Sequence, residues 1–141
     1  MTAFLLDVNV LVALSWPEHT LHLPARKWFA RNSGKGWATC PLVQAGFVRI
    51  VSNPAFSSRS VSVQEAVDAL HASLQDKGHQ FWPDSISIAQ AAALLGGIGD
   101  GHRRVTDAYL VALAIENRGK LATLDRGIEL FAPAESLEII T

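Results

Sequence analysis

Short apolar segments alternate with longer helical patterns along this sequence, and this alternation constrains the fold more than any other feature. Four segments are predicted to be strands, and "SLEII" near the end a weaker fifth: residues 4–8, 37–40, 79–82, 120–125 and 136–140. Continuous apolar strands are typical of parallel sheets buried on both faces, with helices as the crossover connections. The pattern predicts an α/β fold with three layers, in which a mostly parallel central sheet of 4–5 strands is flanked by helices.

Helices are predicted where apolar residues recur at helical spacing between start and stop signals. Ser62 and Glu65 have the spacing of a capping box, and Gly78 is a stop signal. Thr106 is predicted to be the N-cap of the last helix, with Gly119 just past its end. The predicted helices are residues 18–31, 42–52, 62–78, 87–95 and 106–118.

Composition narrows the class of protein. With 141 residues, about half of them apolar, the chain is expected to form a single globular domain over residues 1–141. The single cysteine, Cys40, cannot form an internal disulfide, which fits a reducing compartment such as the cytoplasm. The apolar start lacks a basic segment and is too short to span a bilayer, so neither export nor membrane insertion is expected. A net charge of -1 means that any nucleic acid would be bound by a local basic patch.

Asp7 interrupts the apolar segment "FLLDVNVLVAL", residues 4–14, which has the pattern of a core strand running into a helix. Burying a carboxylate costs several kcal/mol unless a partner neutralises it. Asp125 follows the fourth predicted strand as Asp7 follows the first, and ligands gather at the carboxyl ends of parallel strands. Asp107 lies in the first turn of a helix that begins at the same edge. Converging carboxylates repel unless cations neutralise them, and hard oxygen ligands favour Mg²⁺, with Mn²⁺ also possible.

Each of these acids also has an ordinary structural interpretation. Asp7 could cap a turn or the next helix, and Asp107 is favoured by the helix dipole in any first turn. Asp125, before Arg126 and Gly127, is a plausible turn residue. Only the convergence of all three favours a metal site at Asp7, Asp107 and Asp125.

Three neighbours of the acids are candidates for positioning them. Asn9 could orient Asp7 or contact substrate, and a helix cap explains it equally well. Thr106 could hold Asp107 in place besides capping its helix. Thr123 lies two residues before Asp125, on the same face of a strand, so it could support the site or be a plain β-branched strand residue.

Three segments carry a resemblance to a known family. "LLDVNVLVAL" at residues 5–14, "TDAYLVALA" at 106–114 and "LATLDRGI" at 121–128 resemble, in order and spacing, the acidic motifs of PIN-domain ribonucleases, and more narrowly of VapC-type toxins. "CPLVQAGFVRIVSNPAF", residues 40–56, falls where that family has its second motif. The resemblance implies a Mg²⁺-dependent endoribonuclease that cuts RNA, such as transfer or ribosomal RNA, with a metal-activated water. It further implies a homodimer blocked by a small cognate antitoxin.

Given this resemblance, basic residues are candidates for binding RNA. Arg103 and Arg104, next to Thr106, are the preferred contacts to the RNA backbone. Arg49 could pair with a carboxylate or a phosphate, or simply form a surface salt bridge. Asp100 could be a fourth acid, although an Asp between glycines is usually a turn residue.

The second motif contains a departure from the family. Family members commonly have a glutamate where this chain has Gln44, which could join the catalytic set by binding metal through its carbonyl oxygen but cannot act as a base. Gln44 could also be an ordinary polar helix residue. The site would then work with fewer charges and weaker metal affinity, or the chain would be a catalytically degenerate PIN domain that binds RNA or protein without cleavage. A Mg²⁺-dependent phosphatase is a third possibility, but "DVNV" lacks the second acid that aspartyl-phosphate enzymes use.

Overall fold

Five parallel strands form the central sheet of the computed structural model, which describes residues 2–98 and 101–141. The strands are β1 (Phe4–Leu6), β2 (Trp37–Thr39), β3 (His79–Phe81), β4 (Lys120–Thr123) and β5 (Leu137–Ile139). They lie in the order β3-β2-β1-β4-β5, and every neighbouring pair is parallel. The predicted parallel sheet is therefore confirmed, including the weaker fifth strand.

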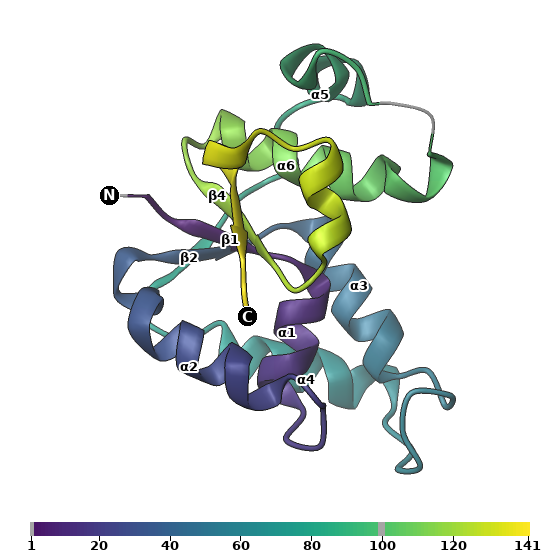
Figure 1. The fold of residues 1–141 in the computed structure, drawn as a ribbon. Coiled ribbons are helices and arrows are strands. Elements are labelled where there is room, and N and C mark those ends of the chain that lie inside the picture. Colours follow the sequence, from purple (N-terminus) through teal and green to yellow (C-terminus); the bar gives the residue numbers. More distant parts are fainter. Residues whose placement is uncertain (1, 99–100) are drawn as a thin grey trace.

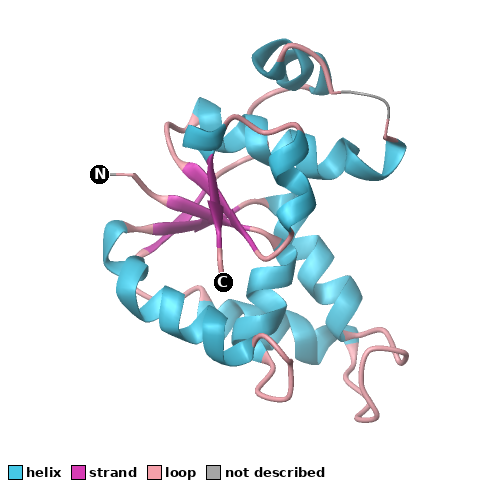
Figure 2. Ribbon diagram, viewed as in Figure 1, coloured by secondary structure: helices cyan, strands magenta, loops and turns pink. Residues whose placement is uncertain are grey.

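Helices cover both faces of the sheet and complete the predicted three layers (Figures 1 and 2). One layer contains α5 and α6, and α1, α2 and α4 lie on the other side of the sheet. The core is continuous across the layers: Leu5 and Leu6 of β1 are fully buried, as are Val111 and Leu113 of α6. The helices are α1 (Val8–Ser15), α2 (His22–Asn32), α3 (Pro41–Val51), α4 (Val63–Ser73), α5 (Ile88–Leu95) and α6 (Val105–Glu116).

The order of the strands places a topological switch point between β1 and β4. The chain builds outward from β1 to β2 and β3, and then returns to place β4 on the other side of β1. The connections before and after this reversal cover opposite faces of the sheet (Figure 1). In open parallel sheets, a crevice forms at such a point outside the carboxyl ends of the strands.

Several predicted element ends require correction. β1 ends at Leu6, two residues earlier than predicted, because Asp7 already caps α1. The capping box of Ser62 and Glu65 starts α4 as predicted, but the helix ends at Ser73, well before Gly78.

The prediction that Thr106 is the N-cap of α6 is wrong. A 3₁₀ turn, His102–Arg104, leads directly into the helix, so that Arg104 takes the cap position and Thr106 lies within the first turn. Gly119 does follow the helix, and it is needed there: a Cβ on Gly119 would lie 2.5 Å from the carbonyl oxygen of Ala3.

Three further expectations concern Cys40, membrane insertion and Asp100. Cys40 is a free, buried cysteine, as the sequence requires. Within residues 2–98 and 101–141, no helix combines the length and the apolar character that crossing a membrane requires. Asp100, the possible fourth acid, lies outside the described residues.

Candidate active site

Asp7 is a buried carboxylate at the carboxyl end of β1, with a side chain only 6% exposed. It is the N-cap of α1, and its Oδ1 accepts a hydrogen bond of 2.7 Å from the backbone N–H of Val8. Its Oδ2 accepts a hydrogen bond of 2.8 Å from the hydroxyl of Thr123. The side chain is therefore held from both the start of α1 and the end of β4, across the switch point.

Thr123 connects the two acids that follow β1 and β4. Besides donating to Asp7, its Oγ1 accepts hydrogen bonds from the backbone N–H of Asp125 at 3.1 Å and from Nδ2 of Asn9 at 3.2 Å. Thr123 is fully buried, so water does not compete for these bonds. The structure thus brings Thr123 into contact with the predicted site, where it is placed to orient Asp7.

Asn9 lies within α1 and is bonded at both ends of its amide. Nδ2 donates to Oγ1 of Thr123 at 3.2 Å and to Oδ2 of Asp7 at 3.4 Å, and Oδ1 accepts a hydrogen bond of 3.2 Å from the backbone N–H of Leu124. The interpretation of Asn9 as a helix cap is wrong, because Asp7 caps the helix. These bonds favour the alternative in which Asn9 orients Asp7, and a contact with substrate stays a prediction.

Asp107 and Asp125 lie beside Asp7 and share one cation, the guanidinium of Arg104. Nη1 of Arg104 donates to Oδ2 of Asp107 at 3.0 Å and to Oδ2 of Asp125 at 2.7 Å. Oδ1 of Asp125 accepts from the backbone N–H of Gly127 at 2.8 Å. The three acids, from a strand end, a helix start and a second strand end, thus meet at one edge of the sheet.

The electrostatics of the group follow from burial and charge. Burial raises the pKa of Asp7 to about 6, and the negative charges of Asp107 and Asp125 add to this effect, while the bonds from Thr123 and Val8 oppose it. The Arg104 guanidinium lowers the pKa of Asp125. The two carboxylates in turn raise the pKa of Arg104.

The donor set fits a hard divalent cation. Asp107 and Asp125 already place one oxygen each around a positively charged nitrogen, at 3.0 and 2.7 Å, whereas Mg²⁺ binds oxygen at about 2.1 Å. In the part of the chain that the structure describes, no group of three or more His, Cys, Asp or Glu side chains is arranged to hold a metal ion. Asp7 is held by Thr123 and Val8, while the other two acids are bonded to Arg104, so a metal ion shared by all three acids would have to replace the guanidinium.

Gln44 is bonded outside this acidic group. Its Nε2 donates to Oγ1 of Thr39 at 3.0 Å, and Nε2 of His79 lies 2.8 Å from the same hydroxyl. Burial lowers the pKa of His79, with the charge of Asp76 opposing it, which favours the neutral imidazole. Among the described residues, none of the hydrogen bonds of Gln44 reaches Asp7, Asp107 or Asp125, and its catalytic role stays a prediction.

The remaining predicted residues lie on the surface. Arg49, Arg103 and Thr106 are exposed, and in residues 2–98 and 101–141 neither arginine forms an ion pair. Arg104 was predicted to contact RNA, and its bonds to two site carboxylates are the feature that sequence reasoning missed. One signal could have indicated the ion pair between Arg104 and Asp107: the two residues are three apart at the start of a helix.

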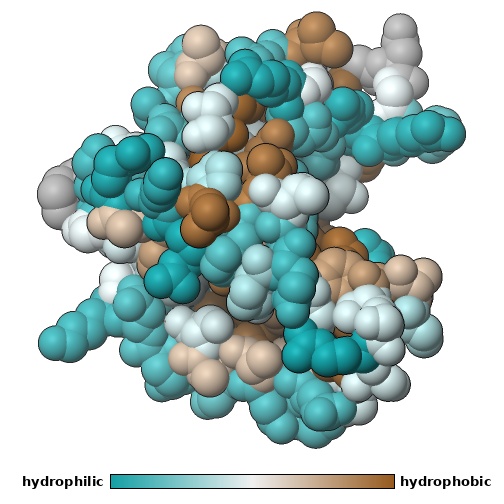
Figure 3. Space-filling model, turned by 60° about the horizontal axis from the view of Figure 1, so that its bottom comes forward, coloured by the Kyte–Doolittle hydropathy of each residue, from teal (hydrophilic) through white to brown (hydrophobic). Residues whose placement is uncertain are grey.

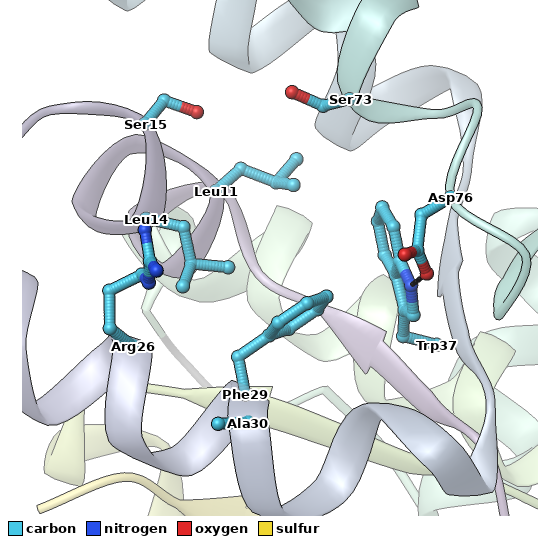
Figure 4. Close-up of a pocket in the computed structure, with 9 residues that line it drawn as sticks. All are labelled: Leu11, Leu14, Ser15, Arg26, Phe29, Ala30, Trp37, Ser73 and Asp76. Carbon is cyan, nitrogen blue, oxygen red and sulfur yellow. Dashed lines mark hydrogen bonds between the residues drawn. The ribbon is translucent and has the colours of Figure 1, made fainter.

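A cavity of about 370 Å³ lies away from the acids, between α1, α2, α4 and β2 (Figure 4). Leu11, Phe29 and Trp37 line it, with Arg26 and Asp76 at its sides. The space-filling view of this side of the molecule shows apolar surface in hollows between hydrophilic rims (Figure 3). None of the residues around the cavity belongs to the predicted site.

Comparison with known families and structures agrees with this geometry. The model of the PIN domain family matches residues 4–132, which include all three acids. The chain therefore belongs to the PIN domain family.

Its curated relatives within that family are VapC ribonucleases. Ribonuclease VapC39 of Mycobacterium tuberculosis is 43% identical over 145 residues, which cover 99% of this chain and 100% of the relative. The structure of VapBC2 from Rickettsia felis, bound to a DNA fragment from their promoter, has a TM-score of 0.69 and 16% identity, covering 99% of this chain and 100% of that one. Mycobacterium tuberculosis VapC20, described as a sarcin-ricin loop cleaving toxin, also has a TM-score of 0.69, with 15% identity over 94% of this chain and 97% of that one. At such identities the two structures support the fold alone.

Proposed function

We propose that this protein is a metal-dependent endoribonuclease that acts as the toxin of a toxin-antitoxin pair. The observation that carries the proposal is the convergence of three carboxylates at the switch point between β1 and β4. Asp107 and Asp125 share the guanidinium of Arg104, and the charges of both act on the buried Asp7 beside them. Full-length similarity to a protein named ribonuclease supports the RNA substrate.

The three acids have distinct parts in this proposal. Asp7, Asp107 and Asp125 would hold Mg²⁺ or Mn²⁺, which when bound supplies Lewis-acid polarisation of a phosphate and activation of water at neutral pH. Thr123 and Asn9 hold the Asp7 carboxylate in one orientation, so that less conformational freedom is lost when a cation binds. Asp7 has to be ionised for this purpose, because a protonated carboxyl is a poor metal ligand.

The basic residues and the partners complete the proposal. Arg103 and Arg104 would bind RNA phosphates at the start of α6, with Arg49 as a further contact. A structural neighbour is described as VapBC2 bound to promoter DNA, and we propose by analogy a small cognate antitoxin for this chain. A homodimer in the cytoplasm is the expected form.

The proposal is tested by incubating purified protein with transfer RNA and ribosomal RNA in a series of Mg²⁺, Mn²⁺ and chelator concentrations. Cleavage should require the metal and stop with chelator. Asp107→Asn should reduce the rate on the order of 10³-fold, because loss of a metal ligand removes several kcal/mol of transition-state stabilisation. The matched control is Asp68→Asn, which changes an exposed acid of α4 and should cut like the parent.

Two outcomes would contradict the proposal. Equal cleavage by Asp107→Asn and the parent would show that the acidic site does not catalyse the cleavage. RNA binding that survives chelation, with no cleavage at any metal concentration, would instead support the degenerate alternative suggested by Gln44.

A further inference from the structure

We propose that Arg104 is a built-in cation of the acidic site, which a divalent metal has to displace before it can bind. This inference rests on the proposed function. It assigns to Arg104 control over metal affinity, which is a different role from a passive contact with RNA.

The contacts of Arg104 place it where a metal would compete with it. A single nitrogen, Nη1, donates to one oxygen of Asp107 and one of Asp125, at 3.0 and 2.7 Å. The side chains are only partly exposed, at 34% for Arg104, 24% for Asp107 and 40% for Asp125. A metal ion held between Asp107 and Asp125 would bind the same two carboxylates, so the guanidinium and the metal compete for them.

The position of Arg104 in α6 is unfavourable by itself. Arg104 is the residue at the N-cap position, its side chain makes no cap bond, and the positive end of the helix dipole disfavours a cation there. Its pairing with Asp107 also has the less favourable order, with the basic residue before the acidic one. The two carboxylates offset these effects, which indicates that the position is determined by the site rather than by the helix.

Gly127 provides an independent observation. A Cβ on Gly127 would collide with Nη2 of Arg104. The φ of Gly127 is not positive, so the backbone does not require glycine at this position. The absence of a side chain at Gly127 thus leaves room beside Asp125 for the guanidinium. Because Nη2 is the end of a flexible side chain, a Cβ here would displace the guanidinium, and it would also lie 3.1 Å from Oδ1 of Asp125.

Once displaced, the partly exposed side chain of Arg104 would be free to bind elsewhere. A bound divalent cation repels the guanidinium and takes over its ligands, while the exposed edge of the site stays within reach of the side chain. There the freed guanidinium can bind a phosphate of RNA in the bidentate manner that arginine favours. Arg104 therefore stabilises the acids in the absence of metal and contacts substrate in its presence.

The test measures Mn²⁺ binding by calorimetry, without RNA, for the parent, Arg104→Gln and Arg103→Gln. The control removes the same charge from the neighbouring exposed residue, so a difference between the variants reports the specific contact. Arg104→Gln should bind Mn²⁺ about three- to tenfold more tightly than Arg103→Gln, since partly exposed ion pairs are modest in strength. In chelator, Arg104→Gln should also melt at a lower temperature than Arg103→Gln, because its acids are left without a counter-ion.

A second variant keeps the inference testable if Arg104→Gln does not fold. Gly127→Ala retains all three carboxylates but displaces the guanidinium, so it should bind Mn²⁺ more tightly than the parent. Equal or weaker binding by the variants overturns the inference, whereas the proposed function still stands if the parent cuts RNA with metal. If neither the parent nor the variants bind Mn²⁺, both the inference and the proposed function fail.

Discussion

Thr39 and Thr123 are both fully buried threonines, and they end the two strands that pair with β1. Their hydroxyl groups nevertheless have different partners. Thr123 is bonded to the Asp7 carboxylate and to the backbone of Asp125, while Thr39 is bonded to the neutral side chains of Gln44 and His79. The carboxyl edge of the sheet thus has a charged half at the switch point and a neutral half beside it. The two threonines have the same residue type and burial. What differs is the place of their strands in the sheet, because β4 lies at the switch point and β2 does not.

The largest expected effect comes from Asp7→Asn, which removes the buried charge from the charged half. The pKa of Asp7 rises from 3.8 to about 6 on folding, so this group stabilises the metal-free protein fully below about pH 4 and loses that contribution as pH rises through 6. This rise in the pKa of Asp7 from 3.8 to about 6 corresponds to about 3 kcal/mol. Metal-free Asp7→Asn should therefore be more stable than the parent at pH 8, by up to that amount, while RNA cleavage is lost.

Urea unfolding in chelator at pH 8 and pH 4 measures this effect. The stability difference between Asp7→Asn and the parent should be largest at pH 8 and nearly absent at pH 4. Asp68→Asn, at an exposed position, should show no such dependence on pH. A variant that is less stable than the parent at pH 8 would show that Asp7 is structural rather than a strained site residue.

The two threonines provide a direct test of the division between the halves. Thr123→Val and Thr39→Val each remove one buried hydroxyl and leave its partners unpaired, so each should lose about 1–3 kcal/mol of stability. Only Thr123→Val should also reduce RNA cleavage, by about 10- to 100-fold, because the hydroxyl of Thr123 orients Asp7. The rates are compared at a temperature where both variants are folded. Equal losses of activity in Thr123→Val and Thr39→Val would show that the two halves do not differ in function.

Metal affinity should depend on pH through the charged half alone. Asp7 is mostly ionised at pH 7 and mostly protonated at pH 5, given its pKa of about 6. A metal ion then has to displace a proton, so Mn²⁺ should bind about tenfold more weakly at pH 5 than at pH 7. Calorimetry at the two pH values measures this, and Asp7→Asn is the control that should lose most of the dependence. An unchanged affinity would indicate that Asp7 does not bind the metal.

The sequence predicts this fold well because the signals are local and the topology is restricted. Continuous apolar strands require parallel pairing, and parallel pairing requires helices between strands, so the three layers follow. The ends of elements are less predictable: Thr106 has the character of an N-cap, but the 3₁₀ turn before it places Arg104 in that position.

For the site, topology predicts which acids meet but not how their side chains pair. Asp7, Asp107 and Asp125 converge because strand ends and helix starts share one edge. The bonds of Arg104 to Asp107 and Asp125 depend on how long side chains pack, and no periodicity in the sequence records this. Thr39 likewise gives no sign in the sequence that it holds Gln44.

The smallest expected effect comes from Gln44→Glu, which places a charge in the neutral half. If Gln44 lies close enough to the acids to share a metal, the added carboxylate should tighten Mn²⁺ binding several-fold, because affinity for hard cations rises with the number of charged ligands. The hydroxyl of Thr39 can donate to the new carboxylate if the Nε2 of His79 donates to Thr39 in turn, so the variant keeps its contacts. Gln44→Ala is the control for losing the amide and should leave affinity unchanged. Equal Mn²⁺ affinity in the parent, Gln44→Glu and Gln44→Ala would show that Gln44 does not bind the metal and belongs only to the neutral half.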